Sequence, residues 1–163
     1  MSIKILITGG TFDKEYNELT GELFFNHTHV PEMLKLGRAR LDINIETVMM
    51  VDSLHIKESD MQKLLDICID SNEDKILITH GTDKMVATAK TLGQKIKDKT
   101  VVITGAIIPY AFGSSDGLFN LGSALAFVQS LPNGVYISMN GRYFNWYNAV
   151  KNRQIGEFEE IKH

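Results

Sequence analysis

Short apolar runs alternate along this chain with segments whose apolar residues recur at helical spacing, and this alternation is what most restricts its fold. Each run is short enough for a buried strand, and the runs are rich in the β-branched residues that strands favour. The strands that we expect cover residues 3–7, 43–51, 75–79, 100–104 and 134–139.

The segments between these runs each place apolar side chains on one face of a helix. Strands that alternate with helices of this length form β-α-β crossovers. We therefore expect an α/β fold with three layers and a mostly parallel, Rossmann-like or flavodoxin-like sheet. Residues 16–30 look like an inserted hairpin or flexible loop, and a short helix is expected after Pro31. The helix faces hold Met61, Leu64, Leu65 and Cys68, then Met85, Val86, Ala89, Leu92 and Ile96, then Leu118, Leu121, Leu125 and Val128.

Length and charge exclude several classes of function. A length of 163 residues suits one domain with one sizeable core, and we expect residues 1–163 to form it. The net charge of −3, with no cluster of lysines or arginines, offers no electrostatic surface for nucleic acid or an anionic membrane. Cys68 is the only cysteine, which rules out an internal disulfide and a cysteine-built zinc site. We expect a cytoplasmic protein that acts on a small molecule, with no metal, cofactor, nucleic-acid or membrane partner.

Polar clusters follow four of the expected strands. In an open parallel sheet the carboxyl ends of the strands share one edge, where ligands bind. Such residues also occur in loops for turn and capping reasons alone, but four clusters at one edge favour a site. The clusters are Thr8-Gly9-Gly10-Thr11, Asp52-Ser53, His80-Gly81-Thr82-Asp83, and Gly105 with Ser114-Ser115-Asp116-Gly117.

The clusters also limit the chemistry of that site. The usual glycine-rich phosphate and dinucleotide loops and the serine nucleophile elbow do not occur in the sequence. What remains is threonine chemistry. A threonine hydroxyl is a poor nucleophile until a neighbouring base takes its proton, and a lysine can be that base.

Two of these strings resemble known signatures. Residues 5–11, Ile-Leu-Ile-Thr-Gly-Gly-Thr, are similar to the first signature of the bacterial-type L-asparaginases, and residues 78–83, Ile-Thr-His-Gly-Thr-Asp, resemble the second. Weaker matches occur at residues 51–53, 102–120 and 139–151, so the resemblance covers nearly the whole chain. It implies the amino-terminal, catalytic domain of the L-asparaginase/glutaminase family.

The resemblance also implies roles for individual residues. Thr11 would attack the side-chain amide of asparagine or of a related small amide, with Tyr16 assisting its activation. Lys151 would be the base of a second constellation with Thr82 and Asp83, and ammonia would be released. The implied substrate-binding residues are Gly10, Asp52, Ser53, Gly81, Thr82 and Asp83, with Ser53 and Asp52 holding the α-carboxylate and backbone N–H groups near Thr82 stabilising the oxyanion.

The chain also departs from the family pattern. Family enzymes carry a carboxyl-terminal domain that supplies an acidic group for the α-amino group of the substrate, and we expect that domain to be absent here. Lys84 and Leu54 replace residues that are usually polar or hydroxylated. Either the charge of Lys84 favours a more acidic ligand, or its side chain lies in the first helical turn and faces solvent, which we expect. The surface that the missing domain would cover favours a homodimer or higher homo-oligomer. The alternative to an amidohydrolase is a catalytically weak, asparaginase-like ligand-binding or interaction module.

Overall fold

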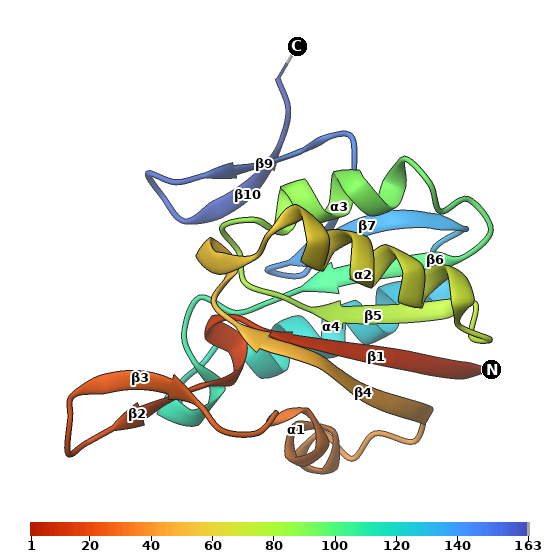
Figure 1. Cartoon of the computed structure of the whole chain (residues 1–163). Coiled ribbons are helices and arrows are strands. Elements are labelled where there is room, and N and C mark those ends of the chain that lie inside the picture. Colours follow the sequence, from red (N-terminus) through yellow and green to blue (C-terminus); the bar gives the residue numbers. More distant parts are fainter. Residues whose placement is uncertain (163) are drawn as a thin grey trace.

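A six-stranded sheet forms the centre of the computed structural model, which describes residues 1–162 (Figure 1). All five expected strands are present; the first is three residues longer than expected, the second is one residue longer, and the other three have the expected bounds. A sixth, antiparallel strand pairs with the fifth. The strands are β1 (Ser2–Gly9), β4 (Asp42–Val51), β5 (Lys75–Thr79), β6 (Thr100–Thr104), β7 (Gly134–Met139) and β8 (Arg142–Asn145).

The strand order is β4-β1-β5-β6-β7-β8, and the first five strands are parallel. Strand β4 pairs with one side of β1, and β5, the next strand of this sheet along the chain, pairs with the other side of β1. The order therefore reverses between β1 and β5, as in flavodoxin-like folds, and such a switch point opens a crevice at the carboxyl ends of the two strands. The loops that begin at Gly10 and His80 meet there.

Two apolar clusters bury the two faces of the sheet. On one face, α2 (Glu58–Asp70) and α3 (Met85–Gly93) pack their apolar sides on alternate residues of the strands; on the other, α1 (Val30–Leu36) and α4 (Gly117–Ser130) do the same (Figure 1). Leu6 and Ile7 of β1, for example, face opposite layers because successive side chains of a strand point to opposite sides. The three-layer α/β prediction is confirmed.

Two hairpins and three short 3-10 turns complete the described chain. The hairpin of β2 (Lys14–Asn17) and β3 (Glu22–Phe25) lies where an insertion was expected. The hairpin of β9 (Ala149–Asn152) and β10 (Glu157–Glu160) was not expected from the sequence. The 3-10 turns are η1 (Thr11–Asp13), η2 (Ser53–His55) and η3 (Tyr110–Phe112). Among residues 1–162, the helices are all too short or too polar to cross a membrane.

Candidate functional site

Two glycines bring the loops after β1 and β5 into direct contact at the switch point. A Cβ atom on Gly10 would lie 2.4 Å from the backbone nitrogen of Gly81, so only glycine allows this approach. Gly10 has φ 72°, a conformation that glycine adopts without strain. Its N–H donates to the carbonyl of Val51 at 2.8 Å, which also attaches the loop to the end of β4.

Ser53 links the ends of β4 and β5. A Cβ atom on Gly81 would lie 2.3 Å from Cβ of Ser53, so the Ser53 side chain packs directly against the backbone of Gly81. The Ser53 hydroxyl accepts a hydrogen bond from the backbone N–H of Asp83 at 3.2 Å. Its own proton therefore stays available for a ligand.

Asp52 pairs with a residue that the sequence analysis did not select. Its carboxylate accepts from the backbone N–H of Leu54 at 3.0 Å and forms an ion pair with the Lys14 ammonium. The hydrogen bond from Lys14 is the main reason that the pKa of Asp52 lies below its ordinary value. The pair connects β2 to the end of β4.

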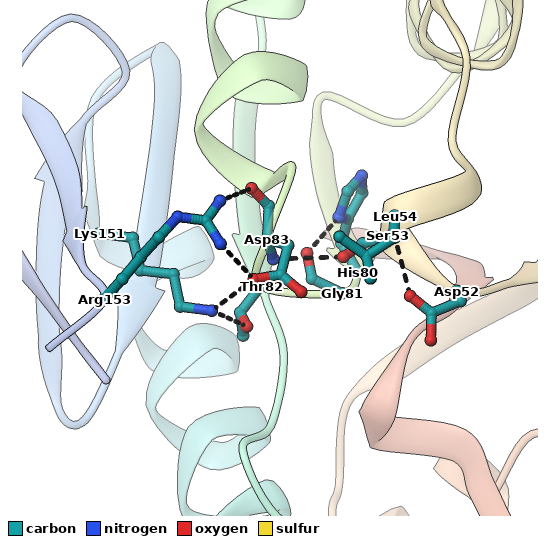
Figure 2. A network of polar contacts seen from close by, with 9 residues as sticks. All are labelled: Asp52, Ser53, Leu54, His80, Gly81, Thr82, Asp83, Lys151 and Arg153. Atoms are coloured by element: carbon teal, nitrogen blue, oxygen red, sulfur yellow. Dashed lines mark hydrogen bonds and ion pairs between the residues drawn. The ribbon is translucent and has the colours of Figure 1, made fainter. Parts of the chain in front are cut away.

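Lys151 reaches the loop after β5 from β9, and its side-chain nitrogen lies between two side chains of that loop. Its Nζ is 2.8 Å from the Thr82 hydroxyl oxygen and 2.9 Å from Oδ1 of Asp83 (Figure 2). Thr82 is 8% exposed, so this contact is largely shielded from water. A lysine amine and a threonine hydroxyl at this distance can exchange a proton, as the predicted chemistry requires.

Arg153 is a second cation on Asp83. Its guanidinium donates to Oδ1 of Asp83 at 3.0 Å and to the Asp83 carbonyl at 3.3 Å (Figure 2). The hydrogen bond from Lys151, then its charge and that of Arg153, hold the pKa of Asp83 below its ordinary value against the opposing effect of burial. Arg153 lies in the turn directly after β9, two residues beyond Lys151. The sequence analysis missed it because β9 was not recognised.

His80 is a buried, neutral support for this loop. Burial lowers its pKa to about 4. Its Nδ1 lies 2.6 Å from the Gly81 carbonyl, and its Nε2 lies 2.8 Å from the Thr88 hydroxyl. The carbonyl can only accept, so Nδ1 carries the proton and Nε2 accepts from Thr88.

Acidification is expected to destabilise the fold through His80. Its folded pKa lies below its unfolded value of 6.5, so the unfolded state binds the proton more strongly. The contribution of His80 is complete above about pH 6.5 and is lost as the pH falls toward about 4. Urea unfolding between pH 7 and 5 measures this loss, which should be smaller in His80→Gln and unchanged in the exposed control His55→Gln. Equal slopes for wild type and His80→Gln would contradict the assignment.

The structure gathers most, not all, of the expected site residues. Gly10, Asp52, Ser53, Gly81, Thr82, Asp83 and Lys151 meet at the switch point, and Thr11 begins the turn next to Gly10. Tyr16 lies on the β2–β3 hairpin and is 56% exposed. Its ring meets the ring of Phe112 edge-on, with the two ring centroids 6.4 Å apart. The expectation for Lys84 is wrong: its side chain is half-buried because its ammonium donates to the Ile56 carbonyl at 2.7 Å.

Side chains that could bind a metal ion were searched for in the described part of the chain. Residues 1–162 contain no group of three or more histidine, cysteine, aspartate or glutamate side chains placed to hold an ion. The charged groups of the crevice, Asp52, Lys14, Asp83, Lys151 and Arg153, are engaged with one another.

Comparison with known proteins finds a matching family model and several similar sequences. The sequence model of the family described as "Asparaginase, N-terminal" matches residues 2–159. L-asparaginase 1 of Escherichia coli (strain K12) is 31% identical over 160 residues, which cover 92% of this chain and 47% of the relative. One subunit of the glutamyl-tRNA(Gln) amidotransferase of Methanococcus vannielii is 30% identical over 173 residues, which cover 94% of this chain and 38% of the relative.

Solved structures agree in fold. The thermostable L-asparaginase from Thermococcus kodakarensis is similar with a TM-score of 0.88 and 26% identity, over 100% of this chain and 52% of its own. A probable cytoplasmic L-asparaginase from Campylobacter jejuni has a TM-score of 0.82 and 29% identity, over 97% of this chain and 52% of its own. The chain thus spans about half the length of the relatives that it matches, or less.

Proposed function

Because the chain belongs to the family of asparaginase amino-terminal domains, we propose that it is an amidohydrolase that cleaves the side-chain amide of asparagine or of a related small amide and releases ammonia. One observation carries the proposal: the Lys151 amine lies within 2.9 Å of both the Thr82 hydroxyl and the Asp83 carboxylate, at the crevice that the fold opens. A shielded threonine in contact with a lysine is the pairing that hydroxyl activation requires.

Thr11 is the proposed nucleophile. In the first step its hydroxyl oxygen bonds to the amide carbon, and its proton passes to the Lys151 amine with Thr82 as the relay. Backbone N–H groups near Thr82 stabilise the oxyanion, and Asp83 stabilises the ammonium that forms on Lys151. The carbon–nitrogen bond then breaks, the proton leaves with ammonia, and water hydrolyses the threonine ester.

The remaining groups orient the substrate. The Ser53 hydroxyl and the backbone at Asp52 hold its carboxylate, and Gly10 and Gly81 leave room for it beside the chain. Tyr16 assists Thr11 in this proposal only when the β2–β3 hairpin bends toward the crevice, because the tyrosine ring is otherwise exposed.

Lys151→Met is the experiment that tests the base. Methionine keeps the length of the stem but accepts no proton, so ammonia release from a screen of small amides is expected to fall about a hundredfold or more. Lys151→Arg keeps the charge beside Asp83 and should be equally impaired, whereas the exposed Lys95→Met should behave like wild type. Activity retained in Lys151→Arg would show that only the ion pair matters and would reject Lys151 as the base.

A binding module is the second candidate function, and the exposed position of Tyr16 favours it. A chain whose activating group does not reach the nucleophile retains ligand binding with little turnover. Wild-type protein that binds a dicarboxylate product yet releases no ammonia from any small amide would select this alternative.

We further propose a homodimer or higher homo-oligomer in the cytoplasm. The side chains of Tyr16, Ile107, Ile108 and Phe112 are all at least 42% exposed, and self-association would shield such apolar surface from water. The cytoplasmic assignment draws its support from the name of the Campylobacter jejuni relative.

A further inference from the structure

Lys14 is a charged residue of the crevice to which the proposed reaction gives no role. It begins β2, directly after η1, and its ammonium forms an ion pair with Asp52, the residue that follows β4. Only 16% of the Lys14 side chain and 28% of the Asp52 side chain are exposed, so water and salt screen the pair only in part. The ammonium also lies 5.9 Å from the centroid of the Phe25 ring, a contact by which the β2–β3 hairpin helps to hold it in place.

This ion pair lies next to the hydroxyl that is proposed to hold the carboxylate of the substrate. Asp52 directly precedes Ser53, and its Oδ1 accepts from the Leu54 N–H at 3.0 Å, which fixes the carboxylate at the start of η2. Asp52 and Ser53 lie at the side of the polar network opposite Lys151 and Arg153 (Figure 2). Consecutive Cα atoms are about 3.8 Å apart, so the Asp52 carboxylate and a carboxylate bound to Ser53 would be on the order of 8 Å apart.

Two carboxylates at such a separation repel each other unless a cation neutralises one of them. The pKa of Asp52 lies below its ordinary value, chiefly because of the hydrogen bond from Lys14, so Asp52 is ionised at neutral pH. Within residues 1–162, Lys14 is the only cation that forms an ion pair with Asp52. Without Lys14, the Asp52 anion would therefore oppose the binding of a carboxylate at Ser53.

A structural tie between the β2–β3 hairpin and the end of β4 is the other use of such an ion pair. Removal of either partner would weaken a tie in the same direction. Neutralisation instead predicts opposite effects on carboxylate binding, because loss of the Lys14 charge leaves an anion beside Ser53, whereas loss of the Asp52 charge leaves a cation there. The two explanations can therefore be separated by changing each partner in turn.

Resting on the amidohydrolase function proposed above, we propose that Lys14 is a specificity-determining residue, which lets the crevice accept a substrate carboxylate at Ser53 by neutralising the adjacent Asp52 anion. Lys14 acts through Asp52 and needs no contact of its own with the substrate. The substrates that depend on it are small amides that carry a carboxylate at the position next to Ser53.

Calorimetric titration of the 163-residue chain with L-aspartate, the product of asparagine hydrolysis, tests the two charges without requiring turnover. Lys14→Met should raise the Kd of L-aspartate about tenfold, because the Asp52 anion is left unpaired. Asp52→Asn should lower the Kd about fivefold, because the Lys14 cation is left unpaired while the new amide oxygen still accepts the Leu54 N–H. The double variant with both changes should bind within about threefold of wild type.

Matched variants control for general effects of charge. Lys14→Arg keeps the cation and should keep the wild-type Kd within about twofold. Lys4 and Glu46 form a second ion pair between β1 and β4, at 2.8 Å but toward the amino-terminal end of β1, away from the crevice. Lys4→Met and Glu46→Gln should each change the Kd of L-aspartate less than about twofold. In the turnover of asparagine, Lys14→Met should raise KM and change kcat less than about twofold.

The outcomes separate this inference from the proposed function. Weaker binding of L-aspartate in both Lys14→Met and Asp52→Asn would identify a structural tie and overturn the inference. An unchanged Kd in Lys14→Met, or no binding of L-aspartate to the wild type, would also overturn it. Opposite effects of the two changes without ammonia release from any small amide would support the inference and reject the amidohydrolase function. Ammonia release that requires Lys151, together with equal losses of affinity in the two variants, would do the reverse.

Discussion

Thr11→Ala is expected to reduce ammonia release more than about a thousandfold, because removal of a nucleophile removes the covalent step itself. Thr11 is the first residue of η1, directly after the Gly10 contact with Gly81, and is half-buried. Alanine keeps the turn and loses only the hydroxyl and a methyl group, so the fold should be preserved. Ammonia release by the purified variants, at saturating and at low amide concentration, measures the loss in kcat and in kcat/KM.

The comparison with Thr82 makes this test specific. Thr82, not Thr11, is the threonine that contacts Lys151 at 2.8 Å. Because Thr82 is the proposed relay, Thr82→Ala should reduce ammonia release about a hundredfold, since water can enter and carry the proton in place of the hydroxyl. Thr11→Ser should recover part of the activity, and the exposed control Thr47→Ala should change nothing. A larger loss of ammonia release in Thr82→Ala than in Thr11→Ala would indicate that Thr82 is the nucleophile and Thr11 the relay.

The strands of this fold could be predicted because they are buried on both faces. Runs with an apolar centre, such as residues 75–79 and 100–104, leave few alternatives to a central parallel strand, and both are present with those bounds. Alternation with helices then predicted the layers and the edge at which the polar loops meet. The hairpin of β9 and β10 was missed because its alternation of apolar and charged residues is short and weak.

The family resemblance implied that Lys151 lies with Thr82 and Asp83, and the three are seen in contact. The partners of Lys14 and Arg153 were not predicted. The pairing of Lys14 with Asp52 spans 38 residues and that of Arg153 with Asp83 spans 70, so local sequence gives no sign of either. Lys84 was expected in solvent because most lysines are solvated, but the Ile56 carbonyl lies within its reach.

Gly10→Ala is expected to lower the free energy of unfolding by about 2 to 6 kcal/mol, the largest effect on stability that the crevice predicts. Two causes act together. The backbone of Gly10 has φ 72° and ψ −175°, a region that side chains avoid. In addition, the new Cβ would lie 2.4 Å from the nitrogen of Gly81 and 2.5 Å from its Cα, which forces apart the loops after β1 and β5.

Gly113→Ala separates the two causes. Gly113 has nearly the same backbone conformation, with φ 73° and ψ 164°, but nothing within 4 Å of its would-be Cβ. It should therefore lose only the backbone contribution, about 1 to 3 kcal/mol, measured by urea unfolding at pH 7. Because the loops that Gly10 joins carry Thr11 and Thr82, Gly10→Ala should also abolish ammonia release under conditions where it is still folded, whereas Gly113→Ala should retain it. Equal losses of stability in the two variants would mean that the contact with Gly81 does not hold the crevice together.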